Sequence, residues 1–285
     1  MERHIEFIDN RHFEINYFRV PPPPSLRLFI DFFWETRFDH LWKKYPKGFS
    51  DAQFPNTGYT YIFTLGTPYT MQVEDKKFNI RTDCFLPRYN NIESSHKPGN
   101  HLFGIKFKIS PVVFEKKIDF SEYKGAVYPL SYLIDNKISN QVKIASSFKE
   151  RIQIVIEYYK TILSNHQSSL KPVHIVSEIL ERANQENDFE ISLENEAKKN
   201  HISTRTLLRY FESCTGIPGK TALQVMRIRK AIAHLIHSPG SFKLEDYGYH
   251  DKSHFYKHLK NFLNKNPVRP QITHLQFLST LHPTS

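Results

Sequence analysis

The chain of 285 residues contains few cysteines and no long apolar run. Its two cysteines, Cys84 and Cys214, are far apart and match no metal-binding spacing, so a disulfide framework is not expected and a reducing compartment fits best. No run of about 18 apolar residues is present, so we expect no membrane-spanning helix and no membrane partner. Residues 1–15 have no apolar core, so we expect no secretory signal peptide. These absences together predict a cytoplasmic protein.

Signatures of catalytic and cofactor sites are also missing. There is no glycine-rich phosphate loop, no nucleophile-elbow serine and no evident carboxylate pair. His254 and His258 are four residues apart, but Phe255 stands where a zinc protease motif would have glutamate. Cys214 has no organised histidine partner in the sequence. We therefore expect no metal, no cofactor, no catalytic residue and no enzymatic activity.

Acidic residues are scarce in one part of the chain only. Residues 198–270 contain 14 of the 39 Lys and Arg residues and 4 of the 29 Asp and Glu residues, which leaves 25 of each elsewhere. The whole net charge of +10 therefore lies in this C-terminal segment. A merely basic surface more often spreads its charge along the chain, whereas a concentrated basic segment is typical of a polyanion-binding protein.

The segment from about residue 49 to residue 107 has the composition of β-strands. Its runs "TGYTYIFTLG" and "HLFGIKFKI" are rich in Tyr, Phe, Ile and Thr, and Gly and Pro separate them. Apolar residues at 103, 105, 107 and 109 alternate with Gly104, Lys106 and Lys108, which predicts a half-buried strand. We expect a β-sandwich or barrel, and either its core or a pocket would contain the rings of Phe54, Tyr59, Tyr61, Phe63 and Tyr69.

Helices are expected on both sides of this segment. After the prolines at 21–24, Ser25 could cap a helix that carries apolar residues at 26, 29, 30 and 33. A longer helical period covers Val142–Leu163, whose apolar stripe would pack either on the protein's own sheet or against a second copy. The polar stretch at 164–172 is the best candidate for a linker. We therefore divide the chain into domains at 1–165 and 166–285.

The C-terminal domain is predicted to be entirely helical. Expected helices cover Val173–Ala183 and Thr221–Ile236, and Gly216 ends another. Three further helices are expected to begin at a capping side chain, namely Ser192, Ser203 and Asp251.

Two of these helices combine a polar outer face with an apolar inner one. In the helix after Ser203, Arg205 and Arg209 lie opposite Phe211, and arginine donors match guanine or phosphate acceptors. In the helix after Asp251, the inner face consists of Phe255, Leu259 and Phe262. A short helix, a turn and such an outer helix form a helix-turn-helix unit, and the pattern occurs twice with a long helix between.

Residues 172–268 resemble the DNA-binding domain of AraC-family transcriptional regulators. The resemblance is carried by "ISTRTLLRYF" and "TGIPGK" in residues 202–220, "RIRKA" at 227–231, "GYHDKSHFYKHLKNF" at 248–262, and Pro267. It implies two helix-turn-helix units with recognition helices at Ser203–Glu212 and Asp251–Asn261. The DNA-binding positions implied by the motif and by the charge pattern are Ser203, Thr204, Arg205, Leu208, Arg209, Lys252, Ser253, Tyr256, Lys257 and Lys260. Leu208 would either touch a thymine methyl group or belong to the core.

The sequence departs from the family pattern in the second unit. Leu244 stands where the family usually has a small residue, and the lead-in "SFKLEDYGY" is about two residues short. We therefore expect a truncated first helix there, and a second unit that clamps phosphates more than it reads bases.

The N-terminal residues, up to about 165, resemble more weakly the poorly characterised domains attached to such regulators, through "FPNTGYTYIFTLG" and "HLFGIKFKISP". The resemblance implies an α+β protein with a mainly β sensor or dimerisation domain and an all-α DNA-binding domain. It also implies double-stranded DNA, a small-molecule effector, a second copy and RNA polymerase as partners, in the nucleoid of a bacterial cytoplasm. The alternative is a DNA-repair or small-molecule-modifying protein with such a domain, but its Pro-Cys-His type of nucleophile motif is absent.

Overall fold

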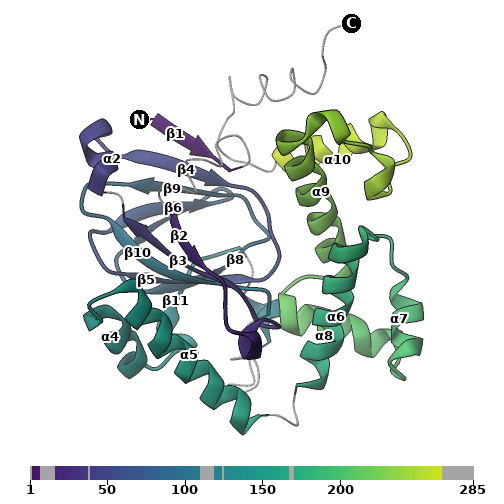
Figure 1. Ribbon diagram of the computed structural model, residues 1–285, viewed down its shortest axis with the longest axis horizontal. Helices are drawn as coiled ribbons and strands as arrows, with labels where there is room; N and C mark the ends of the chain where they lie inside the picture. The colour runs from purple at the N-terminus through teal and green to yellow at the C-terminus, as the bar shows by residue number, and fades with distance from the viewer. Residues whose placement is uncertain are drawn as a thin grey trace, which may run out of the picture.

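The computed structural model describes residues 2–6, 17–37, 39–109, 119–123, 125–166 and 170–264. Two β-sheets with two helices against them form the N-terminal part, and a group of helices forms the C-terminal part (Figure 1). The predicted α+β class is therefore confirmed. The middle of the expected linker, at 167–169, and Pro267 lie outside the described residues.

The N-terminal part contains two sheets, of five strands in the order β1-β4-β9-β6-β7 and of six strands in the order β11-β8-β5-β10-β3-β2. Strand β1 runs parallel to β4, and the other neighbours are antiparallel. The strands are β1 (Glu2–Ile5), β2 (Tyr17–Val20), β3 (Ile30–Arg37), β4 (Phe49–Gln53), β5 (Tyr59–Thr64), β6 (Tyr69–Val73), β7 (Lys76–Ile80), β8 (Cys84–Pro87), β9 (Ile92–His96), β10 (His101–Phe107) and β11 (Tyr128–Pro129).

Helix α2 lies between β3 and β4, the longer helices follow the last strand, and short 3-10 turns lie between the elements. The helices are α2 (Asp39–Lys44), α4 (Asn136–Ile144), α5 (Phe148–Asn165), α6 (Lys171–Glu186), α7 (Leu193–Lys199), α8 (Thr204–Thr215), α9 (Gly219–His237) and α10 (Lys252–Asn264). The 3-10 turns are η1 (Pro24–Leu26), η2 (Phe120–Glu122), η3 (Leu130–Tyr132), η5 (Pro239–Ser241) and η6 (Glu245–Tyr247). No helix among the described residues is long and apolar enough to cross a membrane.

Strand β10 of the six-stranded sheet is buried on both faces, which corrects the prediction of a half-buried strand at 103–109. On one face, Phe103 and Phe107 of β10 contact Phe148 and Tyr159 of α5. The other face meets the five-stranded sheet, and Lys106 lies there with 3% of its surface exposed. Alternation in the sequence therefore marks two different buried environments. Of the aromatic cluster, Phe54, Tyr59, Tyr61 and Phe63 belong to the core on the helical face, and Tyr69 packs between the sheets.

The expected helix after Ser25 is wrong. The chain forms only the 3-10 turn η1 and then enters β3, which pairs with β10 and β2. The segment at 30–37 alternates its contacts between the two buried faces, since Phe33 packs in the core on the helical face and Trp34 packs between the sheets. Sheet pairing and aromatic burial thus outweigh a helical spacing of only four apolar residues.

The expected single helix at Val142–Leu163 is two helices. Helix α4 ends at Ile144, and Ser147 caps α5 by accepting a hydrogen bond from the Glu150 amide at 3.2 Å. The apolar stripe of α5 packs on the protein's own sheet, where Val155 and Tyr159 are buried. This stripe is therefore buried against the sheet and does not form a surface for a second copy of the chain, which was the other interpretation of its sequence.

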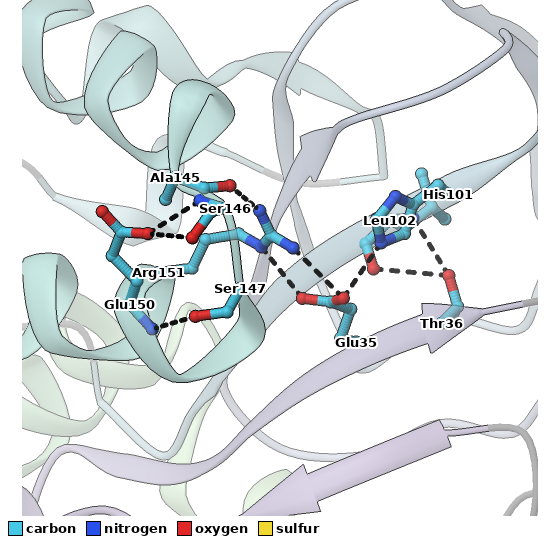
Figure 2. A network of polar contacts seen from close by, with 9 residues as sticks. All are labelled: Glu35, Thr36, His101, Leu102, Ala145, Ser146, Ser147, Glu150 and Arg151. Carbon is cyan, nitrogen blue, oxygen red and sulfur yellow. Dashed lines mark hydrogen bonds and ion pairs between the residues drawn. The ribbon is translucent and has the colours of Figure 1, made fainter.

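A buried ion pair fixes α5 to the six-stranded sheet (Figure 2). Glu35 of β3 is completely buried, and its carboxylate accepts hydrogen bonds from Arg151 Nε at 2.9 Å and Nη2 at 3.3 Å. His101 Nε2 lies 3.0 Å from the same carboxylate, and Arg151 also donates to the carbonyl of Ala145. Each charged group thus has several partners, which offsets the cost of burying it.

Candidate nucleic-acid interface and interior cavity

Helix α8 has a defined beginning and end, as the sequence predicts. The Ser203 hydroxyl accepts a hydrogen bond from the Thr206 amide at 3.1 Å, and Gly216 ends the helix with a left-handed φ of 78°. The buried side consists of Leu207, Phe211 and Cys214. The exposed residues among the predicted DNA-binding positions are Ser203, Thr204, Arg205, Leu208 and Arg209.

The exposed side of α8 carries unpaired cations. Within the described residues, neither Arg205 nor Arg209 makes an ion pair or a side-chain hydrogen bond, so their donors remain available to phosphate or guanine. Leu208 is 40% exposed between them, so it does not belong to the core. Glu212 is exposed on the same stripe, and sequence reasoning missed it although its spacing from Leu208 and Arg209 places it there.

Helix α7 supports α8 and is held by a buried carboxylate. Ser192 caps α7 as predicted, since its hydroxyl accepts from the Asn195 amide at 3.3 Å. Glu196 is 3% exposed and pairs with Arg182 of α6 at 2.5 Å and with Lys199 at 2.9 Å. This contact joins α7 to α6, and both helices pack on α8.

The second unit has no regular first helix. The 3-10 turns η5 and η6 fill the stretch between α9 and α10, which confirms the expected truncation. Gly248 then adopts a left-handed φ of 67°, and the Asp251 carboxylate accepts from the His254 amide at 2.7 Å at the start of α10. The second unit is therefore a short turn followed by one recognition helix.

Helix α10 separates its two faces as predicted. Phe255, Leu259 and Phe262 are buried, and Tyr256 is half-buried. The exposed positions are Lys252, Ser253, Lys257 and Lys260. None of these three lysines forms an ion pair within the described part of the chain, so α10 presents uncompensated positive charge.

The two histidines of α10 have structural partners. The Tyr249 hydroxyl lies 2.8 Å from His258 Nδ1, and the His254 ring contacts those of Tyr249 and His250. Burial, followed by the nearby charges of Arg227 and His254, lowers the pKa of His258 to about 4, so the ring is neutral at pH 7 and its Nδ1 can accept a hydrogen bond from the tyrosine. Among the described residues, no group of three or more His, Cys, Asp or Glu side chains is placed to hold a metal ion.

A cavity of about 70 Å³ lies between the two sheets, and two of its cations were missed in the sequence. Lys106 donates to the carbonyls of Thr57 and Phe107, and burial lowers its pKa to about 7. Arg88 makes no side-chain hydrogen bond to a described residue, its Nε is buried, and burial lowers its pKa to about 10. No carboxylate in the described part of the chain forms an ion pair with either cation, although the carboxylates of Glu6 and Asp51 also line the cavity. Its apolar lining includes Trp34, Ile62, Tyr69, Met71, Leu86 and Leu102.

The carboxylate of Glu6 connects the cavity with helix α9. Glu6 lines the cavity and pairs with Arg229 of α9 at 2.7 Å, and Arg229 also donates to the carbonyls of Phe54 and Pro55. Burial raises the pKa of Glu6, but the charge and hydrogen bond of Arg229, the charge of Arg88 and the hydrogen bond from the Phe54 amide together outweigh it, so the net pKa lies below its usual value.

Each helix-turn-helix unit also touches the N-terminal part. Phe262 of α10 packs against Phe54 in a tilted arrangement, with ring centroids 5.6 Å apart. At the end of α8, a Cβ on Gly216 would come within 2.3 Å of the Tyr59 hydroxyl, so only glycine fits this approach. A single apolar core therefore continues from the sheets into both units.

Comparison with known protein families gives a match to the C-terminal part of the chain. The model of a helix-turn-helix domain family matches residues 197–269. No curated protein matches the chain. Among solved structures, ToxT from Vibrio cholerae with a bound unsaturated fatty acid is similar at a TM-score of 0.41 and 13% identity, covering 78% of this chain and 90% of that one. A second form of ToxT has a TM-score of 0.41 and 11% identity, covering 88% and 96%. These TM-scores lie below 0.5, so neither fold nor ligand is inferred from them.

The two recognition helices, with their capped ends, buried inner faces and unpaired cations, define a DNA-binding protein with two helix-turn-helix units. The family match within residues 197–269 specifies the type: the chain carries an AraC-type helix-turn-helix domain and is a DNA-binding transcription regulator.

Proposed function

We propose that the chain binds specific sites in double-stranded DNA and regulates transcription there. The contacts are made by Ser203, Thr204, Arg205, Leu208, Arg209, Lys252, Ser253, Tyr256, Lys257 and Lys260. The observation that carries this proposal is the exposed stripe of α8, in which Arg205 and Arg209 have no partner among the described residues and flank an exposed Leu208. Arginine pairs with guanine, leucine packs on a thymine methyl group, and such a stripe suits a major groove.

The two units have different roles in DNA binding. Helix α8 reads bases, because it carries arginines and an apolar contact, and α7 supports it. Helix α10 holds phosphates, because its exposed charge is lysine, which binds as a point charge, and no regular helix supports its turn. Helix α9 joins the units, and its 19 residues correspond to about 28 Å, close to the roughly 34 Å of one DNA turn.

In vitro selection of bound DNA with the full-length protein tests this function. We expect a motif of a few base pairs contacted by α8, with a protected backbone region about one helical turn away. Selection that returns no enriched motif, together with equal affinity for random DNA, would contradict sequence-specific regulation.

The N-terminal domain, taken as residues 1–165, is proposed to receive a small-molecule effector in the cavity between its sheets. Arg88 and Lys106 face this cavity with no ion-paired carboxylate among the described residues, so a small organic anion is the expected class. Glu6 offers a route to the domain at 166–285, because it lines the cavity and pairs with Arg229.

Thermal melting with benzoate and with benzamide, its neutral analogue, tests the effector class. Benzoate should raise the melting temperature of the wild type, and benzamide should not. The benzoate effect should disappear in Arg88→Gln. Lys143→Met, which removes a partly exposed lysine that pairs with Asp83 and does not line the cavity, should retain it. Equal responses to the two probes would contradict an anion site.

Further features of the function are proposed from the protein class. We propose a homodimer, contact with RNA polymerase, a place in the nucleoid of a bacterial cytoplasm, and no enzymatic activity. The alternative, a repair or modifying protein that acts through a thiol, is disfavoured because Cys84 and Cys214 are buried and burial raises the pKa of each to about 12. Sedimentation of the protein free and on its selected DNA tests the dimer.

A further inference from the structure

The two helix-turn-helix units are joined by a polar contact as well as by α9 itself. Arg227 lies on α9 with 7% of its side chain exposed. Its Nη1 donates to Glu190 at 3.0 Å, in the segment that leads into α7 of the first unit. Its Nη2 donates to the carbonyl of Gly248, in the turn that leads into α10 of the second unit. One guanidinium therefore binds both units at once.

Arg227 also reaches the second recognition helix through a tyrosine. Its guanidinium carbon lies 3.9 Å from the ring centroid of Tyr249, which is 1% exposed. The hydroxyl of Tyr249 is bonded to His258 on α10, and its ring packs against Phe255 of the same helix with centroids 5.0 Å apart. Tyr249 therefore helps to determine where α10 lies, and Arg227 lies over the ring of Tyr249.

The Arg227 contact is suited to orienting the two units and adds little to the stability of the fold. A guanidinium is planar and has donors in a fixed fork, so it can hold two acceptors and stack on a ring in one orientation, which a lysine ammonium cannot do. The partner carboxylate of Glu190 is 55% exposed, so the ion pair itself contributes little stability. The buried Nε of Arg227 has no hydrogen-bond partner among the described residues, which is a further cost. An apolar side chain would avoid these costs but would not orient the two units.

We propose that Arg227 is a positioning residue that fixes α10 relative to α8, and that it thereby determines which backbone phosphates the second unit grips when the first unit is on its bases. This inference rests on the proposed DNA-binding function of both units. It assigns to Arg227 no contact with DNA.

The experiment compares two DNAs that carry the selected motif. A long DNA includes the protected backbone region of the second unit, and a short DNA ends before it. For the wild type, we expect the long DNA to bind at least about tenfold more tightly, since several lysine–phosphate contacts are lost on the short one. For Arg227→Met, this long-to-short ratio should fall to about two, with unchanged affinity for the short DNA. Hydroxyl-radical footprinting should show the second protected region blurred or lost, while the first stays sharp.

Two further variants distinguish a role in positioning α10 from a direct contact with DNA and from a general effect on stability. Lys257→Ala should lower the long-to-short ratio but leave the second footprint in place, because it removes a contact without moving α10. Arg182→Met, which breaks the ion pair between α6 and α7, should leave the ratio unchanged or lower both affinities together. If Arg227→Met does not fold, Glu190→Gln replaces it, and a smaller fall in the ratio with a blurred second footprint is expected.

The outcomes distinguish this inference from the function on which it rests. A wild-type ratio retained with a sharp second footprint in Arg227→Met, or in Glu190→Gln where that variant replaces it, overturns the positioning role. A wild type that selects no motif contradicts the proposed function instead. A wild type with a motif but equal affinity for both DNAs overturns the inference, because the second unit then grips no phosphates for Arg227 to align.

Discussion

Arg209 and Lys260 are both exposed cations, but their side chains are suited to different DNA groups. Arg209 lies on the exposed stripe of α8 next to Leu208, and Lys260 lies near the end of α10. Forked arginine donors can discriminate a guanine edge, whereas an ammonium group on a flexible chain binds a phosphate without regard to sequence.

Replacement of Arg209 with alanine should therefore cost about 1–3 kcal/mol at the selected site and relax the preference at nearby base pairs. Lys260→Ala should weaken all sequences about equally. Binding-site selection repeated with both variants provides the measurement. An unchanged motif for Arg209→Ala would show that α8 does not read bases through this residue.

His258 makes the stability of the protein depend on pH. Its pKa is lowered to about 4 in the folded protein, below the 6.5 of an unperturbed histidine, so the unfolded chain takes up the proton first as the pH falls. The contribution of the neutral ring is therefore complete above about pH 6.5 and is lost as the pH falls toward 4. We expect a loss of about 1–2 kcal/mol from this residue once solvent screening is allowed for.

Urea unfolding at pH 7 and at pH 4.5 measures this effect, with His258→Asn as the comparison. Asparagine can still accept from Tyr249 but does not titrate. The variant should lose less stability than the wild type between the two pH values, since other acid-sensitive groups are common to both. Equal losses would indicate that His258 is not buried as a neutral ring.

At the scale of the element, α10 depends on its buried face. A helix of 13 residues is only marginally stable alone, so tertiary packing must hold it. Phe255 is 2% exposed and packs against Phe242 and Tyr249. Phe255→Ala should therefore cost about 3–5 kcal/mol of unfolding free energy. Lys257→Ala should leave the melting temperature nearly unchanged, and a large fall in it would show that the exposed face also contributes to stability.

The attachment of α5 to the sheet depends on the ion pair between Arg151 and Glu35. Arg151→Met would leave a fully buried carboxylate without its arginine partner, which should cost about 3–5 kcal/mol. Glu35→Gln combined with Arg151→Met should be destabilised by less than the sum of the single variants, because the unpaired charge is gone. Denaturant unfolding of the three variants gives the coupling, and strict additivity would argue against a direct pair.

At the scale of the whole molecule, affinity for DNA should depend steeply on salt. The proposed contacts include five cations, Arg205, Arg209, Lys252, Lys257 and Lys260, and each phosphate contact releases bound counterions from DNA. Affinity of the full-length protein should fall about 10²–10³-fold between roughly 50 and 200 mM salt. Titrations at several salt concentrations measure the slope, and a flat response would exclude phosphate contacts as the main source of affinity.

The sequence by itself determined the ends of the C-terminal helices and the faces that they expose. Ser192, Ser203, Asp251 and Gly216 act through neighbours within a few residues, so their roles can be read locally. The same holds for the concentration of positive charge and for the short second unit, whose missing helix follows from its length.

Only the tertiary structure decided features that depend on residues far apart in the chain. The segment at 30–37 is a strand because β2 and β10 pair with it, and Lys106 is buried because a second sheet covers the face on which it lies. Arg227 joins residues that are 37 and 21 positions away, so no local pattern could show its role. These positions are set by long-range pairing and packing, whose free energies exceed the local preferences that a sequence displays.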